Sequence, residues 1–497
     1  MEVIVAVVGW MAQMISRSSS TAGISFNIQN LTDKLSSSAQ VYLPGSNGFN
    51  NATARWSSLD TPNFRMVVAP NVENDVAEIV KFANGMNIPY LAVTGGHGAI
   101  TTVKNVHDGI GIWMKNLDSV EIAPDGLTAA IGGGALTKVV VDTLWAAGKQ
   151  TVTGICHCTS ILGPGLGGGH GALQGRYGLV SDQFVSMNVV LGNGTMITVD
   201  ETRHSDLWWA MRGAGHNFGI VTSVSSKIYD IQNPNWAYTS FIYTGDKVKS
   251  VFDTINNLFP RGTQSVDILT LVLFVNNYDV DPTKPLVAFY VLQEGVDVVD
   301  PIYTTPFQSL GPIMVVPGSG PYTDLPAWIG EDNDSPSCMK AGLVNIRFPI
   351  DIEFYNTTAL QSAYDLFAAT TQEYPALNNS AFLFEGYSLQ AVKKIRGESS
   401  AFPFRQDNYL VSPLIIYPPG SARLDETAFK FGEDLRQILY IGTQREELHT
   451  YVNYAYGDET PRNWYGYDQW RQSRLSALKK SYDPLGKFNF YAPIVAQ

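Results

Sequence analysis

Two glycine-built loops constrain this chain more than any other feature. The first reads Thr94-Gly95-Gly96-His97-Gly98-Ala99 and follows a short apolar stretch, Tyr90 to Val93. The second begins at Gly154-Ile155-Cys156 and runs into Gly163-Pro164-Gly165-Leu166-Gly167-Gly168-Gly169-His170-Gly171. Because glycine has no side chain, its backbone can approach a ligand closely, and successive N–H groups can surround a diphosphate. An imidazole in one loop and a thiol in the other offer two points of covalent attachment to an electrophilic ring, which indicates a flavin-binding enzyme.

The composition limits the class of protein. The chain has 497 residues, of which 45% are hydrophobic and 16% charged, so it can bury a large core and form two domains or one elaborated domain. Its formal net charge of -12 argues against nucleic acid as a partner, because phosphate binding needs a basic face. The sequence has no run of about 20 apolar residues of the kind that spans a membrane.

The N-terminus and several triplets favour secretion. Residues Val3 to Ile15 are apolar and small residues follow up to Ala22, as in a signal peptide, although no basic residue precedes the apolar run. A buried N-terminal segment or a misplaced start is the alternative interpretation. Asn-x-Ser/Thr triplets support a secreted glycoprotein, and they begin at Asn30, Asn51, Asn193, Asn333, Asn356 and Asn378.

From Asn63 onward, apolar patterns alternate between strand and helix. Strands are expected at 67–69 and 90–93, and the helix between them ends near Asn87. Further elements in this part are a helix from an N-cap at Thr137 to Ala147, a hairpin of strands 187–191 and 196–199 around Asn193-Gly194, and a short helix over 206–212.

The pattern changes near residues 231–234. From there to about Arg423, strand-like segments such as 269–274, 286–292 and 410–417 alternate with Pro-rich loops. This texture predicts a second, mostly antiparallel domain that builds a substrate pocket. The C-terminal part returns to helices over 424–439 and 468–482, so the expected fold class is α+β.

Together, these motifs resemble the FAD-linked oxidases of the berberine bridge enzyme-like group, within the vanillyl-alcohol oxidase superfamily. The resemblance to fungal members of this group is close. The similarity runs from Val67 to Ile228, is looser in the middle, and returns at Tyr451-Val452-Asn453-Tyr454, Tyr482-Asp483-Pro484 and Phe488 to Tyr491. It implies a PCMH-type FAD-binding domain of two α/β subdomains and a substrate domain with a large antiparallel sheet flanked by helices. The expected divisions are a signal peptide at 1–25, the FAD-binding domain at 26–232, the substrate-binding domain at 233–425, and a C-terminal segment at 426–497 that completes the FAD-binding domain.

The resemblance implies FAD held by two covalent bonds. His97 matches the histidine joined to the methyl carbon of the benzenoid ring, and Cys156 matches the cysteine joined to the neighbouring ring carbon. Cys158 is not expected to form this link, because the distance to the glycine run favours Cys156. The other residues expected to bind FAD are Thr94, Gly95, Gly96, Gly98, Ala99, Gly163, Gly167, Gly168, His170, Gly171, Gly219, Ile220, Val221, Asn489 and Tyr491.

The sequence departs from the fungal relatives beside the linking cysteine. Thr159-Ser160 stand where Val-Gly is usual, close to where dioxygen meets the reduced flavin, and His157 replaces a common proline. The first departure bears on how efficiently the protein uses oxygen.

Catalysis requires a group that accepts a proton from the substrate hydroxyl. Tyr454 matches the catalytic-base tyrosine of the family, and Tyr451 is its neighbour. A tyrosinate can act in this way if its pKa of about 10 is lowered by a cation or by the flavin. Glu385 and Gln390, on an expected strand over 382–390, are candidates for orienting the substrate or the base.

Simpler roles for the same residues stay open. His97 could be a structural loop residue, Cys156 a buried inert thiol, and Tyr454 a core tyrosine. Cys156-His157-Cys158 with His170 formally offers metal ligands, but adjacent residues converge poorly on one ion, so no metal is expected. Residues 163–168 also match a dinucleotide fingerprint, yet more glycine follows in place of a helix. The three cysteines are too few for a disulfide framework.

The resulting hypothesis is an FAD-dependent oxidoreductase that removes hydride from a small organic substrate. The substrate is expected to be an alcohol or phenol-like secondary metabolite, with dioxygen as the acceptor and hydrogen peroxide as the product. Oligosaccharide oxidation is one alternative. Another is a flavin-fold scaffold that directs a cyclisation or isomerisation without net redox turnover.

Overall fold

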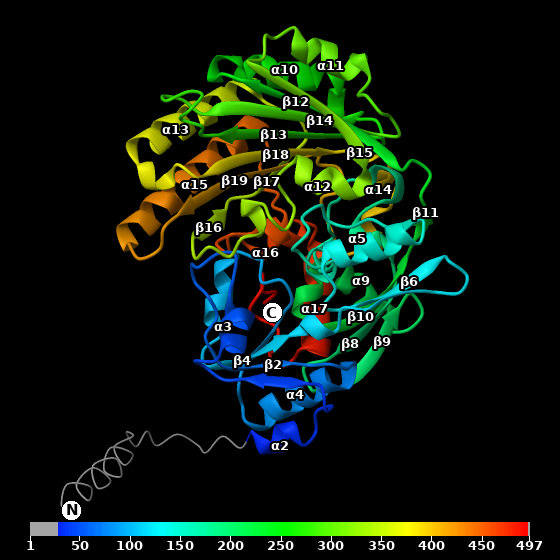
Figure 1. The fold of residues 1–497 in the computed structure, drawn as a ribbon. Coiled ribbons are helices and arrows are strands. Elements are labelled where there is room, and N and C mark those ends of the chain that lie inside the picture. Colours follow the sequence, from blue (N-terminus) through cyan, green and yellow to red (C-terminus); the bar gives the residue numbers. More distant parts are fainter. Residues whose placement is uncertain (1–27, 496–497) are drawn as a thin grey trace, which may run out of the picture.

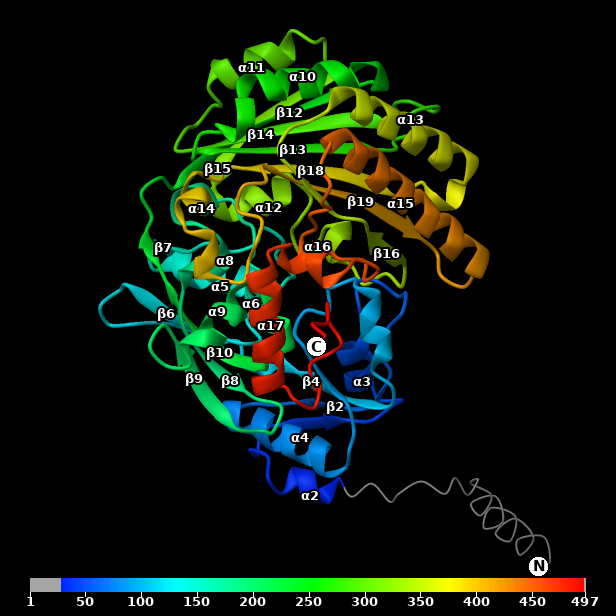
Figure 2. The same ribbon diagram turned by 180° about the vertical axis from the view of Figure 1, so that it is seen from behind.

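A computed structural model describes residues 28–495, and the expected signal peptide at 1–25 lies outside the described residues. One large sheet with its helices forms the upper part of the molecule in Figure 1, and sheets of four and five strands form the lower part. The same division is visible from behind in Figure 2. The expected α+β class and the antiparallel substrate domain are confirmed.

The first small sheet is mostly parallel. Its strand order is β1 (Gln40–Tyr42), β2 (Phe64–Ala69), β4 (Gly109–Trp113) and β3 (Tyr90–Val93), and only β1 is antiparallel to its neighbour. Helix α4 (Glu73–Gly85) packs Val76, Ile79 and Val80 into the core beneath this sheet. The expected strands and helix of this region are therefore confirmed, and β3 delivers the chain directly into the loop that carries His97.

The second small sheet is antiparallel. Its strand order is β5 (Val120–Ile122), β6 (Thr128–Gly132), β10 (Ile220–Lys227), β8 (Phe184–Val190) and β9 (Met196–Asp200). The expected hairpin is confirmed as β8 and β9, and Gly194 at its turn has a φ of 80°, which favours glycine. Helices α5 (Thr137–Ala146) and α9 (Ser205–Ala214) belong to this part.

One local expectation here is wrong. Thr137 is the first residue of α5, and Leu136 occupies the N-cap position. The backbone N–H of Thr137 instead donates to the Thr159 carbonyl at 2.7 Å. This bond ties the start of α5 to the loop that follows Cys156.

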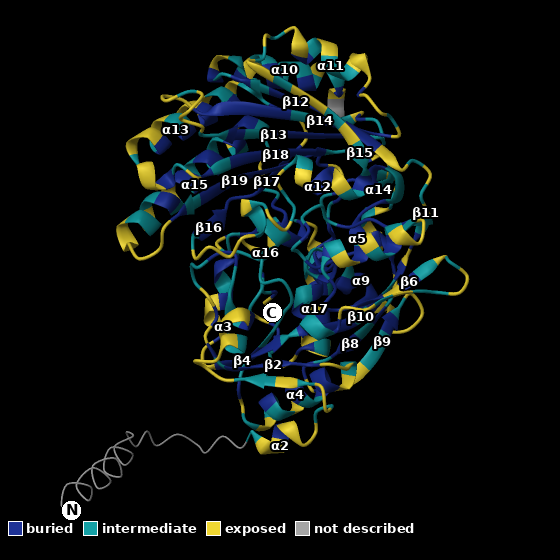
Figure 3. Cartoon of the chain, in the orientation of Figure 1, coloured by how far each residue is buried: buried dark blue, intermediate teal, exposed yellow. Residues whose placement is uncertain are grey.

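The large sheet has eight antiparallel strands. Its order is β15 (Met314–Pro321), β12 (Asn235–Tyr243), β14 (Leu286–Glu294), β13 (Ile268–Val275), β18 (Ala381–Tyr387), β19 (Tyr409–Tyr417) and β16 (Val344–Arg347), and β17 (Ile350–Ile352) also pairs with β19. Helices α10 (Val248–Leu258), α13 (Thr357–Glu373) and α15 (Ala422–Thr443) pack on one face through a shared core. Figure 3 shows the inner strands of this sheet as largely buried, whereas the edge strand β15 is more exposed.

Strand alternation gives the large sheet a second, inner face. Phe382 and Phe384 of β18 pack into the outer core with the helices, whereas Leu383, Glu385 and Tyr387 line a cavity on the opposite side. Side chains on a strand point alternately to its two faces, so this placement follows from the period of the strand. The inner face of the sheet therefore forms one wall of the site.

The chain returns to the lower part after α15. Helix α17 (Gln469–Tyr482) packs near α9, and the Nζ of Lys479 donates to the carbonyls of Asn217 at 2.8 Å and Phe488 at 3.0 Å. Helix α15 contributes to the outer core of the large sheet, so the expected boundary at 425/426 falls inside this helix. Among the residues from 28 to 495, no helix has the length and apolar character needed to cross a membrane.

We predict that a buried ion pair between the two parts stabilises their contact. Arg405 donates to both carboxylate oxygens of Asp182, at 2.9 and 2.8 Å, and their side chains are 2% and 4% exposed. Changing Arg405 to Met leaves a buried carboxylate without its cation, and we expect a loss of about 3 kcal/mol in the apparent free energy of unfolding by urea. The exposed pair of Lys430 and Asp434 provides the control, since Lys430→Met should change that free energy by less than about 0.5 kcal/mol. Equal effects of the two variants would contradict the prediction.

Candidate active site

A cavity of about 620 Å³ lies between the inner face of the large sheet and the two glycine-built loops. This volume is typical of sites for cofactors and small molecules. The loops at 94–99 and 154–163 contribute to its wall, as do residues of β13, β18 and β19. Tyr451, Tyr454 and Tyr491 complete the lining from the C-terminal part of the chain.

The two loops leave backbone donors unused at this cavity. The backbone N–H groups from Gly95 to Gly98 and from Gly154 to Cys156 donate no hydrogen bond to any residue that the structure describes. These half-buried groups are free to donate to a ligand that brings acceptor atoms into the cavity. The diphosphate and ring oxygens of FAD are acceptors of this kind, and the loop chemistry therefore fits the cofactor.

His97 lies in the cavity wall as a neutral imidazole. Burial and nearby cations lower its pKa to about 4. Its Nε2 lies 2.9 Å from the carbonyl oxygen of Ser337, and its ring stacks on Trp56 with centroids 4.4 Å apart. Because a carbonyl only accepts hydrogen bonds, Nε2 carries the proton and Nδ1 keeps its lone pair. The ring is thus fixed in orientation, with one nucleophilic nitrogen.

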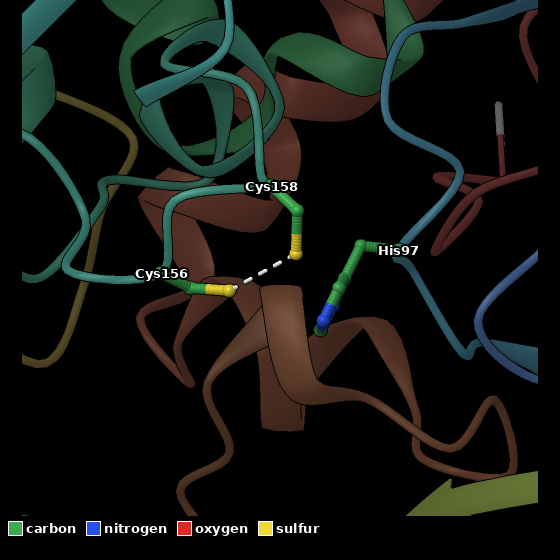
Figure 4. Close-up of side chains that lie close together, drawn as sticks. All are labelled: His97, Cys156 and Cys158. Atoms are coloured by element: carbon green, nitrogen blue, oxygen red, sulfur yellow. Dashed lines mark hydrogen bonds between the residues drawn. The ribbon is translucent and has the colours of Figure 1, made fainter. Parts of the chain in front are cut away.

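Three cysteines meet beside this histidine. Cys158 forms a disulfide with Cys338, and Cys156 is the free thiol. The Sγ of Cys156 lies 3.3 Å from that of Cys158 and 3.5 Å from that of Cys338. Figure 4 shows Cys156 and Cys158 on one loop and His97 on a facing loop. The sequence pattern did not indicate this cross-link, because Cys338 lies in a loop of the other domain.

The same cluster brings together side chains of the kind that bind metal ions. Ligand atoms of His97, Cys156 and Cys158 lie within 4.8 Å of one another. However, the Cys158 sulfur is bonded to Cys338, so only His97 and Cys156 remain as donors in this group. Two donors do not make the four-ligand set of a structural zinc site.

A buried carboxyl faces the attachment loops from the sheet. Glu385 accepts hydrogen bonds from the hydroxyls of Tyr454 at 2.9 Å and Tyr387 at 2.6 Å. Burial raises the pKa of Glu385, and the Tyr387 hydrogen bond, Arg347 and the Tyr454 hydrogen bond act in the opposite direction. The guanidinium of Arg347 lies 4.1 Å from the Tyr454 ring centroid, and its Nη1 is buried without a hydrogen-bond partner in the described chain.

The tyrosine of this pair is hard to ionise. Burial and the charge of Glu385 raise the pKa of Tyr454 well above its ordinary value, although Arg347 lowers it. The sequence led us to expect that a cation lowers the pKa of this tyrosine. Arg347 does lower it, but burial and the charge of Glu385 raise it by more. Of the two groups, Glu385 is therefore the more acidic and the better candidate to carry a negative charge.

Most of the sequence-predicted site residues come together at this cavity. Those that line it are Thr94, Gly95, Gly96, His97, Gly98, Ala99, Cys156, Gly163, His170, Gly219, Ile220, Val221, Glu385, Tyr451, Tyr454 and Tyr491. The Tyr451 hydroxyl accepts hydrogen bonds from the His170 N–H at 3.3 Å and from Asn453 Nδ2 at 2.7 Å, so it also supports the glycine run.

Five predicted residues lie away from the cavity lining. A Cβ at Gly167, Gly168 or Gly171 would clash with Asn453, Phe402 or the Thr153 carbonyl, respectively, so these glycines permit close packing behind the site. Asn489 is exposed. The strand expected over 382–390 ends at Tyr387, and Gln390 instead begins helix α14 (Gln390–Lys394) and donates to the Gln264 carbonyl at 3.2 Å.

Other lining residues were missed from the sequence. Tyr387 lies two positions after Glu385, so the strand alternation could have identified it. Trp56, Glu331 and Arg347 also line the cavity, but they lie in segments without a recognisable motif. They enter the site through the tertiary fold.

Comparison with known proteins agrees with this geometry. The family described as "FAD binding domain" matches residues 64–200. The chain is 50% identical over 467 residues to the FAD-linked oxidoreductase chyH of Penicillium rubens, and the match covers 94% of this chain and 93% of that protein.

Solved structures show the same fold at lower identity. BBE-like 1 of Physcomitrella patens superposes with a TM-score of 0.80 at 19% identity, covering 94% of this chain and 99% of that one. Glucooligosaccharide oxidase of Acremonium strictum, which carries a 6-S-cysteinyl, 8α-N1-histidyl FAD, gives a TM-score of 0.78 at 17% identity, with 94% and 99% covered. The protein is an FAD-dependent oxidoreductase that belongs to the family of these fungal FAD-linked oxidoreductases and has the fold of a berberine bridge enzyme-like protein.

Proposed function

We propose that this enzyme oxidises a small hydroxyl-bearing organic molecule, an alcohol or a phenol, with dioxygen as the electron acceptor and hydrogen peroxide as the second product. The observation that carries this proposal is the Glu385–Tyr454 pair, which lies across the same cavity that His97 and Cys156 line. Bound FAD supplies the acceptor for the hydride. The protein then has to hold the substrate and remove the proton of its hydroxyl.

Glu385 and Tyr454 form a route for this proton. The Tyr454 hydroxyl already donates to Glu385, so it can accept the substrate proton while it passes its own to the carboxylate. This transfer avoids a free tyrosinate, which burial and the charge of Glu385 oppose. The second hydrogen bond, from Tyr387, holds the carboxylate in place for the transfer.

The lining of the cavity favours a largely apolar substrate. Leu269, Leu271 and Leu273 of β13, together with Leu383 and Leu414 of the neighbouring strands, present aliphatic side chains to the cavity. An oligosaccharide would leave its hydroxyls without partners against this surface. We therefore favour an aromatic or other apolar secondary metabolite over a sugar.

We further propose that the flavin is attached through His97 and Cys156. His97 offers a neutral nitrogen with a free lone pair, and Cys156 offers the free thiol of the cluster. The glucooligosaccharide oxidase that shares this fold holds its FAD by bonds to a histidine and a cysteine, which supports the proposal.

The proton route predicts a pH dependence. Glu385 must be ionised to accept the proton, so kcat/KM should fall as the pH drops through the raised pKa of this group. Glu385→Gln should remove this acid limb and lower kcat by about 10²-fold or more, and Tyr454→Phe should lower kcat by a similar factor. Flavin bleaching measured without oxygen, with the best substrate from a panel of benzylic alcohols and phenols, gives these rates.

Gln390→Ala provides the control for these variants, because Gln390 lies outside the cavity lining. We expect its kcat to stay within about twofold of the wild type, well short of the effect of a lost proton acceptor. An acid limb that persists unchanged in Glu385→Gln would contradict the assignment.

The attachment sites make a second prediction. Denatured wild-type protein should keep its yellow colour, and the double variant His97→Ala, Cys156→Ala should release all of its flavin on acid precipitation. Each single variant should keep the other bond, which the masses of the flavin-bearing peptides would reveal. His170→Gln changes another cavity imidazole and should keep both bonds. Flavin that stays attached in the double variant would place the bonds elsewhere.

A further inference from the structure

We propose that Glu331 accepts the proton of the Cys156 thiol when this thiol forms its bond to the flavin ring. The inference deepens the proposed attachment and rests on it. It assigns a role to a loop of the substrate domain, residues 329–338, that no sequence motif marks. This proton transfer occurs once, when the flavin becomes attached to Cys156, and it is separate from substrate turnover.

The loop meets both attachment residues. The Ser337 carbonyl lies 2.9 Å from His97 Nε2, and the Glu331 carbonyl accepts a hydrogen bond from the His157 N–H at 3.0 Å. His157 directly follows Cys156, and this bond requires a residue other than proline at position 157. The Glu331 carboxyl lies near the Cys156 thiol, and both residues line the cavity.

The disulfide holds this loop against the attachment site. Cys338, near the end of the loop, is bonded to Cys158, two residues after Cys156. Because the Cys156 sulfur is nearly equidistant from the two disulfide sulfurs, at 3.3 and 3.5 Å, it lies beside their bond and not along its axis. Thiol–disulfide exchange needs attack on one sulfur, with the other leaving opposite the attacker. This arrangement keeps Cys156 as the free thiol and Glu331 next to it.

Cys156 needs a proton acceptor in this position. The thiolate is the nucleophilic form of cysteine, and burial together with the charge of Glu331 raises the pKa of this thiol. Burial raises the pKa of Glu331, and Glu385 adds to this effect, whereas Arg347 lowers the pKa of both Glu331 and the thiol. His97 is the other basic group near the thiol, but its pKa is lowered to about 4 and its free nitrogen is the one proposed to bond to the ring.

The S–H bond of Cys156 and one ring C–H bond break, and a C–S bond forms. The thiol proton goes to Glu331 and the ring proton to solvent. The two electrons released are taken up by the oxidised flavin, which is itself the other reactant, and pass on to dioxygen. Glu331 returns its proton to solvent through the cavity.

The test compares the rates at which the thioether forms. Full-length protein purified after a short induction is incubated with FAD, samples are digested, and mass spectrometry gives the fraction of His97-linked flavin that also carries Cys156. At pH 7, Glu331→Gln should form this second bond at least about 100-fold more slowly than the wild type, while the His97 bond forms normally. Raising the pH should restore much of the rate, because hydroxide then removes the thiol proton.

Asp334→Asn is the matched control. It removes one negative charge from an exposed position of the same loop and should form the thioether at the wild-type rate. A retained His97 bond in Glu331→Gln shows that the cavity is still intact. A wild-type rate in Glu331→Gln at pH 7, or a slow rate that does not rise with pH, would overturn the role of Glu331 and leave the attachment standing. A wild-type protein that never forms the thioether would overturn both proposals.

Discussion

Backbone N–H groups between Gly95 and Gly98 and between Gly154 and Cys156 have no acceptor within the described protein, and they all border one cavity. A ligand that supplies acceptor atoms in this cavity can pair with them. The surrounding fold places both loops at the wall of this cavity. The short strand β3 delivers the first loop, and close packing behind Gly167, Gly168 and Gly171 brings the second loop to the same wall.

The large antiparallel sheet provides the opposite wall and the chemistry of proton transfer. Its outer face is buried under helices, which leaves the alternate residues of β18 to line the cavity. Glu385 is one of these residues, and two tyrosine hydroxyls donate to its carboxylate. The two walls are joined directly by the Cys158–Cys338 disulfide and by the Arg405–Asp182 ion pair. The site therefore depends on contacts between the domains as much as on either domain alone.

The sequence predicted those parts of the molecule that depend on local patterns. The glycine loops, β3, the β8–β9 hairpin and four strands of the large sheet (β13, β14, β18 and β19) follow from periodicity and turn chemistry. The motif resemblance identified His97, Cys156 and Tyr454 as members of one site, and the structure places all three at one cavity.

Long-range features were not accessible in this way. Cys338 is 180 residues from Cys158, so nothing local indicated their bond. Arg347 and Glu331 enter the cavity from segments without a motif, because tertiary packing brings them there. The pKa of Tyr454 could not be predicted from the sequence either. It depends on burial and on the charge of Glu385, which the tertiary fold places beside it.

A crystal structure of the purified yellow protein would test the central claim most directly. We predict continuous electron density from the flavin ring to the side chains of His97 and Cys156, with the Glu385–Tyr454 pair beside the open face of the ring. A ring bound elsewhere, or one turned so that Glu385 and Tyr454 lie out of reach of its reactive nitrogen, would contradict it.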